Sequence, residues 1–269
     1  MEQFAKPLDI GELAGPALRN PGVATNYAYG GARARDASAT IPNRHLPDQL
    51  STYLADSGGI ASPGALHVIF IGGKDIAPDA VFAFASSPAV GLAIIGEAVG
   101  TIDGVIRTLY ASGARKFLVM NSPDLGLTPS LAIAGQLEDP RAADLARCPS
   151  YWFNFGNNPQ PVLCPDLGFN FEGLDDKLDA IEDDIPDPAL EIIRYDVYSR
   201  FLEMVLEPRP GDPQNGVDTC ILPNYLVEDP LYPPFTCKRP ADYVFWDGIH
   251  PTKAVHGIIA DEVGMLVAD

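Results

Sequence analysis

The sequence predicts a mixed α/β protein built on a parallel sheet, and three observations support this. Short runs of apolar and β-branched residues alternate with longer segments of helical periodicity, which is typical of βαβ units. The runs at residues 66–73 and 115–121 end in turn residues, as buried parallel strands do. With 269 residues, 46% of them hydrophobic, one large core is the simplest arrangement. We therefore expect a single domain over residues 1–269.

The elements follow in order along the chain. After the strand at 66–73, apolar residues recur at helical spacing over 89–114 and stop near Gly113, which predicts a crossover helix leading to the strand at 115–121. Residues 174–186 form an amphipathic pattern that ends at Pro186, residues 190–197 read as a third strand, and 198–206 and 251–267 read as helices. Two proline-rich regions, about 122–170 and 208–243, are expected to be irregular loops.

Composition excludes several classes of function. Acidic residues outnumber basic ones 36 to 18, and the formal net charge of −18 disfavours binding to nucleic acid or to anionic lipid headgroups. No stretch reaches the roughly 18 unbroken apolar residues of a membrane span. Residues 1–13 lack the basic, apolar and small-residue regions of a secretory signal.

Four cysteines, Cys148, Cys164, Cys220 and Cys237, lie too far apart for a CxxC motif. Two disulfides are one interpretation, with Cys148–Cys164 and Cys220–Cys237 the most local of three pairings. Four reduced thiols in a cytosolic protein are the alternative, which the missing signal favours. No histidine pair has metal-ligand spacing, and the sequence implies no metal or organic cofactor.

Ligands of open parallel sheets bind beyond the carboxyl ends of the strands, so the segments that follow the strands are the candidate sites. The segment IGGKDI (residues 71–76) and the segment TNYAYGGARA (residues 25–34) both carry paired glycines. These could present backbone N–H groups to an oxyanion, or they could be ordinary turns. Ser122 lacks the G-x-S-x-G context of an exposed nucleophile.

The stretch FWDGIHPTKAVHG (residues 245–257) carries the strongest catalytic pattern. Asp247 can accept a hydrogen bond from His250 Nδ1 and so present Nε2 to a reacting group. An aspartate that caps a helix beside an incidental histidine is the alternative. The other histidines, His45, His67 and His256, are expected to be structural.

Several blocks together, in this order, resemble the GDSL esterases and lipases of the SGNH hydrolase superfamily. They are NYAYGGA, VIFIGGKDI, NSPDLGLTP and YVFWDGIHPT, and the resemblance runs from about Glu2 to the C-terminus. It implies a flavodoxin-like three-layer α/β/α sandwich and serine-dependent hydrolysis of a small-molecule, lipid or sugar ester. It also implies that His250 is the general base, that Asp247 orients it, and that Gly31 or Gly30 supplies an oxyanion N–H.

Two departures from the family pattern stand out. Lys74 occupies the position of the asparagine that donates to the oxyanion, and an ammonium on a flexible stem replaces a fixed amide poorly. The family's GDS nucleophile block is absent, because the chain opens at MEQFAKPL, which resembles a helix downstream of it.

We therefore expect an N-terminally incomplete member whose serine and first strand lie upstream of residue 1. The full-length protein would then be secreted or periplasmic, which removes the conflict with the cysteines. Without a central strand, the chain as given should fold poorly or need a complementing segment. A catalytically inactive binding or structural protein is the alternative, and oligomeric state cannot be read from the sequence.

Overall fold

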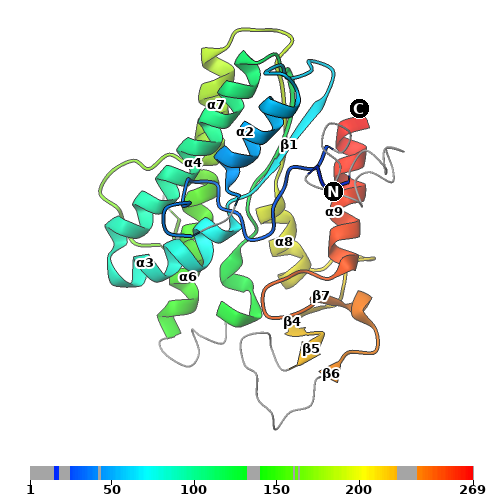
Figure 1. Cartoon of the computed structure of the whole chain (residues 1–269). Coiled ribbons are helices and arrows are strands. Elements are labelled where there is room, and N and C mark those ends of the chain that lie inside the picture. Colours follow the sequence, from blue (N-terminus) through cyan, green and yellow to red (C-terminus); the bar gives the residue numbers. More distant parts are fainter. Residues whose placement is uncertain are drawn as a thin grey trace.

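A computed structural model describes residues 15–17, 25–41, 44–131, 140–159, 161–162, 164–222 and 235–268, without the side chains of 140–146. The helices are α2 (Leu46–Asp56), α3 (Val81–Ser86), α4 (Pro88–Ala111), α6 (Pro140–Phe155), α7 (Leu174–Asp184), α8 (Val197–Leu206) and α9 (Lys253–Ala268). The short helical turns are η1 (Asp75–Ala80), η2 (Leu125–Leu127) and η3 (Pro240–Asp242). Figure 1 shows these elements in chain order.

Three parallel strands form the main sheet: β1 (Leu66–Phe70), β2 (Lys116–Met120) and β3 (Glu191–Tyr195). Their order is β1-β2-β3, with Leu66 opposite Lys116 and Lys116 opposite Glu191. All three expected strands are therefore present, each shorter than its apolar run. Because the strands are parallel, the segments after Phe70, Met120 and Tyr195 lie at the same end of the sheet. This is the end at which ligands of open parallel sheets bind.

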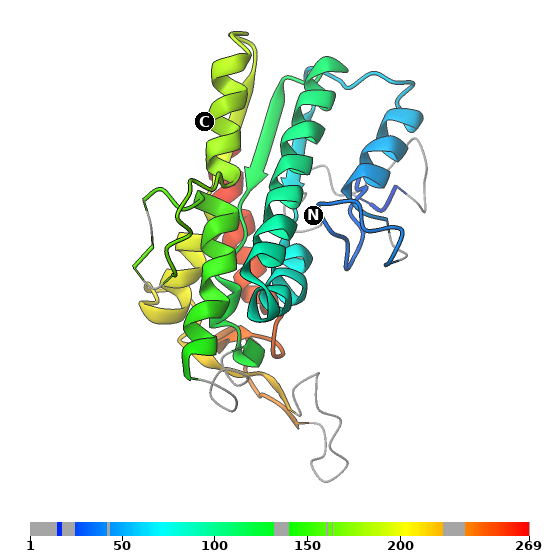
Figure 2. The ribbon, with the colours of Figure 1, turned by 90° about the vertical axis from the view of Figure 1, so that its left-hand side faces the viewer.

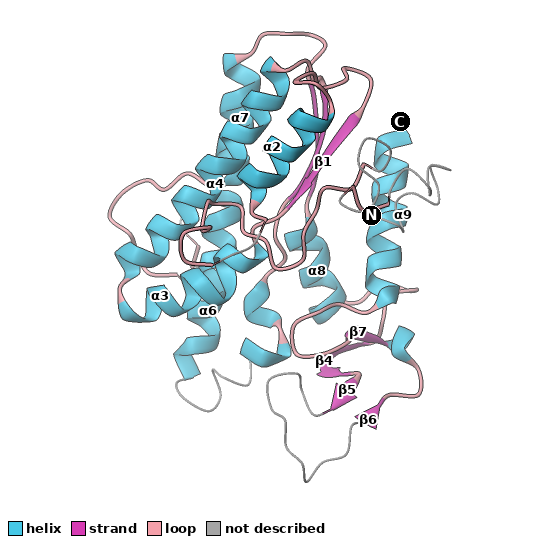
Figure 3. Ribbon diagram, in the orientation of Figure 1, coloured by secondary structure: helices cyan, strands magenta, loops and turns pink. Residues whose placement is uncertain are grey.

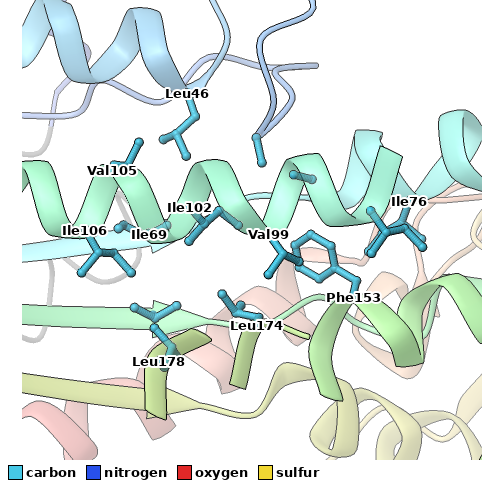
Figure 4. Close-up of a cluster of buried hydrophobic side chains, with 14 of the residues drawn as sticks. Leu46, Ile69, Ile76, Val99, Ile102, Val105, Ile106, Phe153, Leu174 and Leu178 are labelled. Atoms are coloured by element: carbon cyan, nitrogen blue, oxygen red, sulfur yellow. The ribbon is translucent and has the colours of Figure 1, made fainter. Parts of the chain in front are cut away.

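Helices cover both faces of this sheet, which makes a three-layer α/β/α arrangement (Figures 2 and 3). On one face, Ile69, Phe117 and Val119 pack with residues of α2, α4, α6 and α7. Figure 4 shows part of this cluster, in which Ile102 and Ile106 of α4 lie among residues of other elements such as Ile69 of β1 and Leu178 of α7. On the other face, Leu118 and Met120 pack against α8, α9 and β7 (Tyr243–Phe245). The alternation of side chains along β2 thus supplies both layers of the core.

Local sequence explains where the helices begin. Pro88 lies in the first turn of α4, where its missing N–H has no partner to lose. Asp196 caps α8 by accepting a hydrogen bond from the Ser199 amide at 3.0 Å. Asp176 of α7 accepts from the Gly173 amide at 2.8 Å, in the manner of a capping box.

Helix α4 is the one helix in the described ranges that is long and apolar enough to cross a membrane, and 44% of its most apolar stretch is buried. Its buried residues, including Ile95, Ile102 and Ile106, belong to the core beside the sheet. The apolar composition of α4 is therefore accounted for by its position as a core helix.

The two regions expected to be irregular contain regular elements. Helix α6 lies within 122–170, although Pro149 stands inside it. Trp152 and Phe153 of α6 are fully buried in the core, so tertiary packing stabilises a helix that its composition does not predict. The second region contains β4 (Asn215–Thr219), β5 (Ile221–Leu222) and β6 (Phe235–Thr236). The segment MEQFAKPL, expected to resemble a downstream helix, lies outside the described residues.

Candidate active site

Asp247 and His250 face each other in the loop between β7 and α9. His250 Nδ1 lies 2.9 Å from Asp247 Oδ2 and 3.1 Å from Oδ1. Oδ1 also accepts hydrogen bonds from the backbone amides of Ile249, at 2.8 Å, and His250, at 2.7 Å. The Asp247 side chain is 9% exposed, whereas 64% of the His250 side chain is exposed. A buried carboxylate therefore holds one nitrogen of an imidazole whose surface is largely open.

The surroundings of Asp247 favour its charged form. Burial by itself raises the pKa of Asp247, but the amides of His250 and Ile249 and the His250 imidazole together hold that pKa below its ordinary value. An ionised carboxylate at Nδ1 fixes the tautomer with its proton on Nδ1, which leaves the lone pair of Nε2 available as a base. The geometry thus matches that of an orienting aspartate and a general-base histidine.

Backbone pairing holds this dyad loop, residues 246–251, in a tight fold. Trp246 N donates to His250 O at 2.8 Å, and Thr252 N donates to Val244 O at 2.8 Å. The Thr252 hydroxyl donates to the carbonyl of Tyr243 at 2.8 Å. Helix α9 begins only at Lys253, so the Asp247 carboxylate caps the turn that carries His250 rather than the helix.

The loop after β2 contacts the dyad loop and contains the buried Ser122. Ser130 N donates to Gly248 O at 3.0 Å, which joins the two loops. Ser122 is buried, its amide donates to Asn154 Oδ1 at 2.9 Å, and its hydroxyl donates to the Pro123 carbonyl. Within the described residues the Ser122 hydroxyl hydrogen-bonds to a carbonyl and to no histidine, so it lacks the adjacent base that activates a serine nucleophile.

The paired glycines after the segment NYAY form a hydrogen-bonded turn. Ala32 N donates to Tyr29 O at 3.1 Å, and Gly31 has φ +76°, a conformation that favours glycine. Both Gly30 and Gly31 are exposed. The backbone of Gly30 and Gly31 therefore forms a turn, as one of the two interpretations predicts. Because the turn is exposed, its N–H groups could also donate to an oxyanion.

Buried charges attach this glycine block to the loop after β1. Asp75 is fully buried and accepts a hydrogen bond from Ala34 N at 2.7 Å. Arg35 Nε lies 3.2 Å from Asp75 Oδ1, at ion-pair distance. Arg33 Nε and a second guanidinium nitrogen donate to Asp79 at 2.6 and 2.9 Å, and Arg35 also pairs with Asp79. Two arginines and two aspartates thus hold the segment that follows Gly31 against the segment that contains Lys74.

Burial is the main influence on Asp75 and raises its pKa to about 6, although Ala34 N, Arg35 N and the Arg35 charge oppose this. Sequence reasoning named Asp75 only as the neighbour of Lys74. A basic pair two residues apart, Arg33 and Arg35, and an acidic pair four residues apart, Asp75 and Asp79, are the signal that could have indicated this network.

Lys74 is half-buried and precedes η1. Within the described residues its ammonium has no ion-pair partner, because the adjacent Asp75 and Asp79 are paired with the two arginines. Lys74 and His250 share no hydrogen bond in the same part of the chain. The structure therefore joins the candidates in two separate pairs, Asp247 with His250 and the loop of Gly31 with the loop of Lys74. Within the described residues no hydrogen bond or ion pair links one pair to the other.

The remaining candidates have structural environments. His45 is buried, with Nδ1 accepting from Arg33 N at 3.1 Å and Nε2 2.9 Å from the Ile41 carbonyl. His67 Nε2 lies 3.0 Å from the Tyr53 hydroxyl. Disulfides join Cys148 to Cys164 and Cys220 to Cys237, the more local pairing. In the part of the chain that the structure describes, no group of three or more His, Cys, Asp or Glu residues could hold a metal ion.

Comparison with known proteins follows the same blocks. Residues 2–263 match the family model described as GDSL-like Lipase/Acylhydrolase. The chain is 23% identical to GDSL esterase/lipase At1g23500 of Arabidopsis thaliana, over 97% of this chain and 73% of that protein. It is 23% identical to GDSL esterase/lipase At5g03810 of the same plant, over 88% of this chain and 67% of that protein. Lipase 1 of Photorhabdus luminescens is 35% identical over 40% of this chain and 16% of that protein. The family match over nearly the whole length, the parallel sheet between helical layers and the order of the blocks show that the chain belongs to the GDSL-like lipase and acylhydrolase family.

Proposed function

We propose that this protein is a carboxylic ester hydrolase in which His250 is the general base, Asp247 orients it, and the nucleophilic serine comes from a segment upstream of residue 1. The observation that carries the proposal is the 2.9 Å contact between Asp247 Oδ2 and His250 Nδ1 on a largely exposed imidazole. Membership of an esterase and lipase family supports ester hydrolysis in general. Small-molecule, lipid or sugar esters are the substrate class.

The proposed reaction assigns one role to each of these groups. His250 Nε2 accepts the proton of the serine hydroxyl as its oxygen attacks the ester carbonyl, and Asp247 stabilises the resulting imidazolium. The imidazolium then gives this proton to the leaving alcohol, which leaves an acyl-enzyme that water hydrolyses with His250 as base. The backbone N–H of Gly31 or Gly30 and the ammonium of Lys74 would stabilise the oxyanion of each tetrahedral intermediate.

The edge of the sheet supports an upstream segment. Within the described residues β1 pairs with β2 alone, and Phe70 at its carboxyl end is 50% exposed. If a further parallel strand paired with β1, its carboxyl end would lie at the same end of the sheet as the segment containing Lys74. Disulfides persist in oxidising compartments, so the two disulfides support a full-length protein that is secreted or periplasmic.

An inactive binding protein of the same fold is the second candidate. It is favoured by Lys74 at the position of the oxyanion asparagine and by the absence of a GDS block from residues 1–269. Loss of a triad serine costs roughly six orders of magnitude in a serine protease, so residues 1–269 alone should hydrolyse esters roughly a million-fold more slowly than a member with the complete triad.

Two experiments distinguish these candidates. The DNA upstream of Met1 should encode, in frame, a signal peptide and a GDS block, whereas a stop codon directly upstream favours the inactive protein. The extended protein should hydrolyse a short-chain p-nitrophenyl ester, and His250→Ala should abolish this activity. His256→Ala, which changes an exposed histidine on α9, is the matched control and should leave the rate unchanged. Equal rates for wild type and His250→Ala would refute the assignment of His250.

A further inference from the structure

A small hairpin closed by a disulfide lies beside the dyad loop. Strands β5 and β6 are antiparallel, with Ile221 opposite Thr236, and the Cys220–Cys237 disulfide follows directly at the base of the pair. Cys237 N donates to Cys220 O at 2.7 Å. Cys220 is 0% exposed and Cys237 6% exposed. We call residues 220–222 and 235–237 the disulfide hairpin. In Figure 3 it lies at one end of the molecule, next to β4 and β7.

Backbone hydrogen bonds connect this disulfide hairpin to the residues directly before Asp247. Cys220 N donates to Phe245 O at 3.1 Å, and Ile221 N donates to Trp246 O at 2.9 Å. On the other side of the same segment, Trp246 N donates to His250 O, and Phe245 bridges to Pro251. Residues 245–246 are therefore held between the disulfide hairpin on one side and the segment of the dyad loop that contains His250 and Pro251 on the other.

The hairpin depends on its disulfide because each of its strands has only two residues. An isolated two-stranded hairpin is marginal in water even with longer strands. The cysteines are 17 positions apart, so the bond removes much of the entropy of the open chain between them. The other supports of the dyad loop, the amide of Ser130 on Gly248 and the hydroxyl of Thr252 on Tyr243, act at different points.

We propose that the Cys220–Cys237 disulfide is a positioning element for the catalytic dyad, holding Trp246 so that the carboxylate of Asp247 stays aligned with His250 Nδ1. This proposal rests on the proposed function, in which that alignment makes His250 a base. It predicts that opening this disulfide loosens the dyad while the core stays folded. It also makes the competence of the site depend on an oxidising environment.

The test compares two double variants of the same chain, Cys220→Ala with Cys237→Ala and, as a matched control, Cys148→Ala with Cys164→Ala. The first readout is hydrogen exchange at the amides of Ile249 and His250, which both donate to Asp247 Oδ1. The second is the tautomer of the neutral His250 ring, read from its 15N chemical shifts, because the hydrogen bond to the carboxylate keeps the proton on Nδ1. Neither readout needs the nucleophile.

In the first double variant we expect exchange at both amides to accelerate by about tenfold or more, because local opening becomes easier. We also expect the His250 ring to lose its preference for the Nδ1-protonated tautomer. The control should lose thermal stability but keep both signatures. Equal protection of the two amides in both variants would overturn the proposal. A wild-type chain in which the neutral His250 ring carries its proton on Nε2 would overturn both this proposal and the dyad itself, so the two failures are distinguishable.

A second variant keeps the inference testable if the first does not fold. Ile221→Pro removes the N–H that donates to Trp246 O and leaves the disulfide in place. The same acceleration at Ile249 and His250 is expected, in a smaller amount. Unchanged exchange in this variant would show that the disulfide hairpin does not position the dyad.

Discussion

Asp75 should make the stability of this protein fall as the pH rises from about 4 to about 7. Its carboxyl is fully buried, and burial raises its pKa to about 6, from 3.8 in the unfolded chain. Between these two values the folded state binds more protons than the unfolded state, so the free energy of unfolding decreases with pH. A difference of about 2 pKa units at 1.36 kcal/mol each gives a loss of about 3 kcal/mol, complete above pH 7.

The substitution Asp75→Asn isolates this effect because an amide stays neutral over the whole range. The variant lacks the charge that faces Arg35, so its stability at any one pH can lie above or below that of wild type. The difference in free energy of unfolding between the variant and wild type, however, should rise in favour of the variant by roughly 2.5 kcal/mol from pH 4 to pH 7. The prediction therefore concerns how the difference in free energy of unfolding changes with pH, and it makes no claim about that difference at any one pH.

Urea unfolding followed by circular dichroism at several pH values measures this difference. Sucrose, which stabilises folded states, can keep the transition in range if the chain is marginally stable. Asp212→Asn is the matched control, since hydrogen bonds from Arg200 hold the pKa of Asp212 below its ordinary value. The stabilising contribution of Asp212 is complete above the pKa that this residue has in the unfolded chain. The difference in free energy of unfolding between Asp212→Asn and wild type should therefore stay constant from about pH 4.5 to 7. A constant difference for Asp75→Asn as well would refute the reasoning, because Asp75 would then be ionised throughout.

Three further predictions concern a turn, the oxyanion site and the dyad loop. Gly72→Ala should lower the free energy of unfolding by about 2–4 kcal/mol in urea titrations, because its Cβ would lie 2.3 Å from the Phe153 ring at a φ of +117°. Gly73→Ala, which meets no atom within 4 Å, should change it by about 1 kcal/mol or less. Lys74→Asn in the extended protein should raise kcat on a p-nitrophenyl ester, by up to about 10²-fold if a fixed amide restores the donor, and a fall in kcat would show that the ammonium is the better donor. Thr252→Val, which removes the buried hydroxyl bonded to a carbonyl of β7, should cost about 1–3 kcal/mol in thermal unfolding, and an unchanged melting temperature would count against its role in the dyad loop.

The parts of the fold that sequence predicts are those with one dominant local signal. Strands β1 and β2 lie in apolar runs that end in turn residues, and α4 is a long apolar helix with a proline in its first turn. Strand β3 carries a weaker signal, the apolar pair Ile192 and Ile193 between Glu191 and Arg194. Helix α6 carries no such signal, since Pro149 interrupts it and its stability comes from Trp152 and Phe153 in the core. Strand β7 has only three residues and exists through its pairing with β4, a contact that no local pattern encodes.

The same distinction applies to the candidate site. Asp247 and His250 are three positions apart, so their contact is local and the motif suffices to predict it. The network of Arg33, Arg35, Asp75 and Asp79 joins segments about 40 residues apart, and nothing within either segment specifies the other. Sequence therefore indicates the residues of the dyad, whereas the buried charges that hold the glycine block appear only in three dimensions.

The register of the sheet also has a consequence for synthesis on the ribosome. Met120 pairs with Tyr195. At a translation rate of about 5–20 residues per second, β3 is therefore synthesised roughly 4–15 s after β2. During that interval the apolar residues of the central strand have a partner only on the side of β1. The dyad comes later still, because its loop needs both the chain around residue 220 and the chain around residue 250. Slow release of the nascent chain, or a chaperone that shields β2, should therefore raise the yield of folded protein more than any change within the active-site loop.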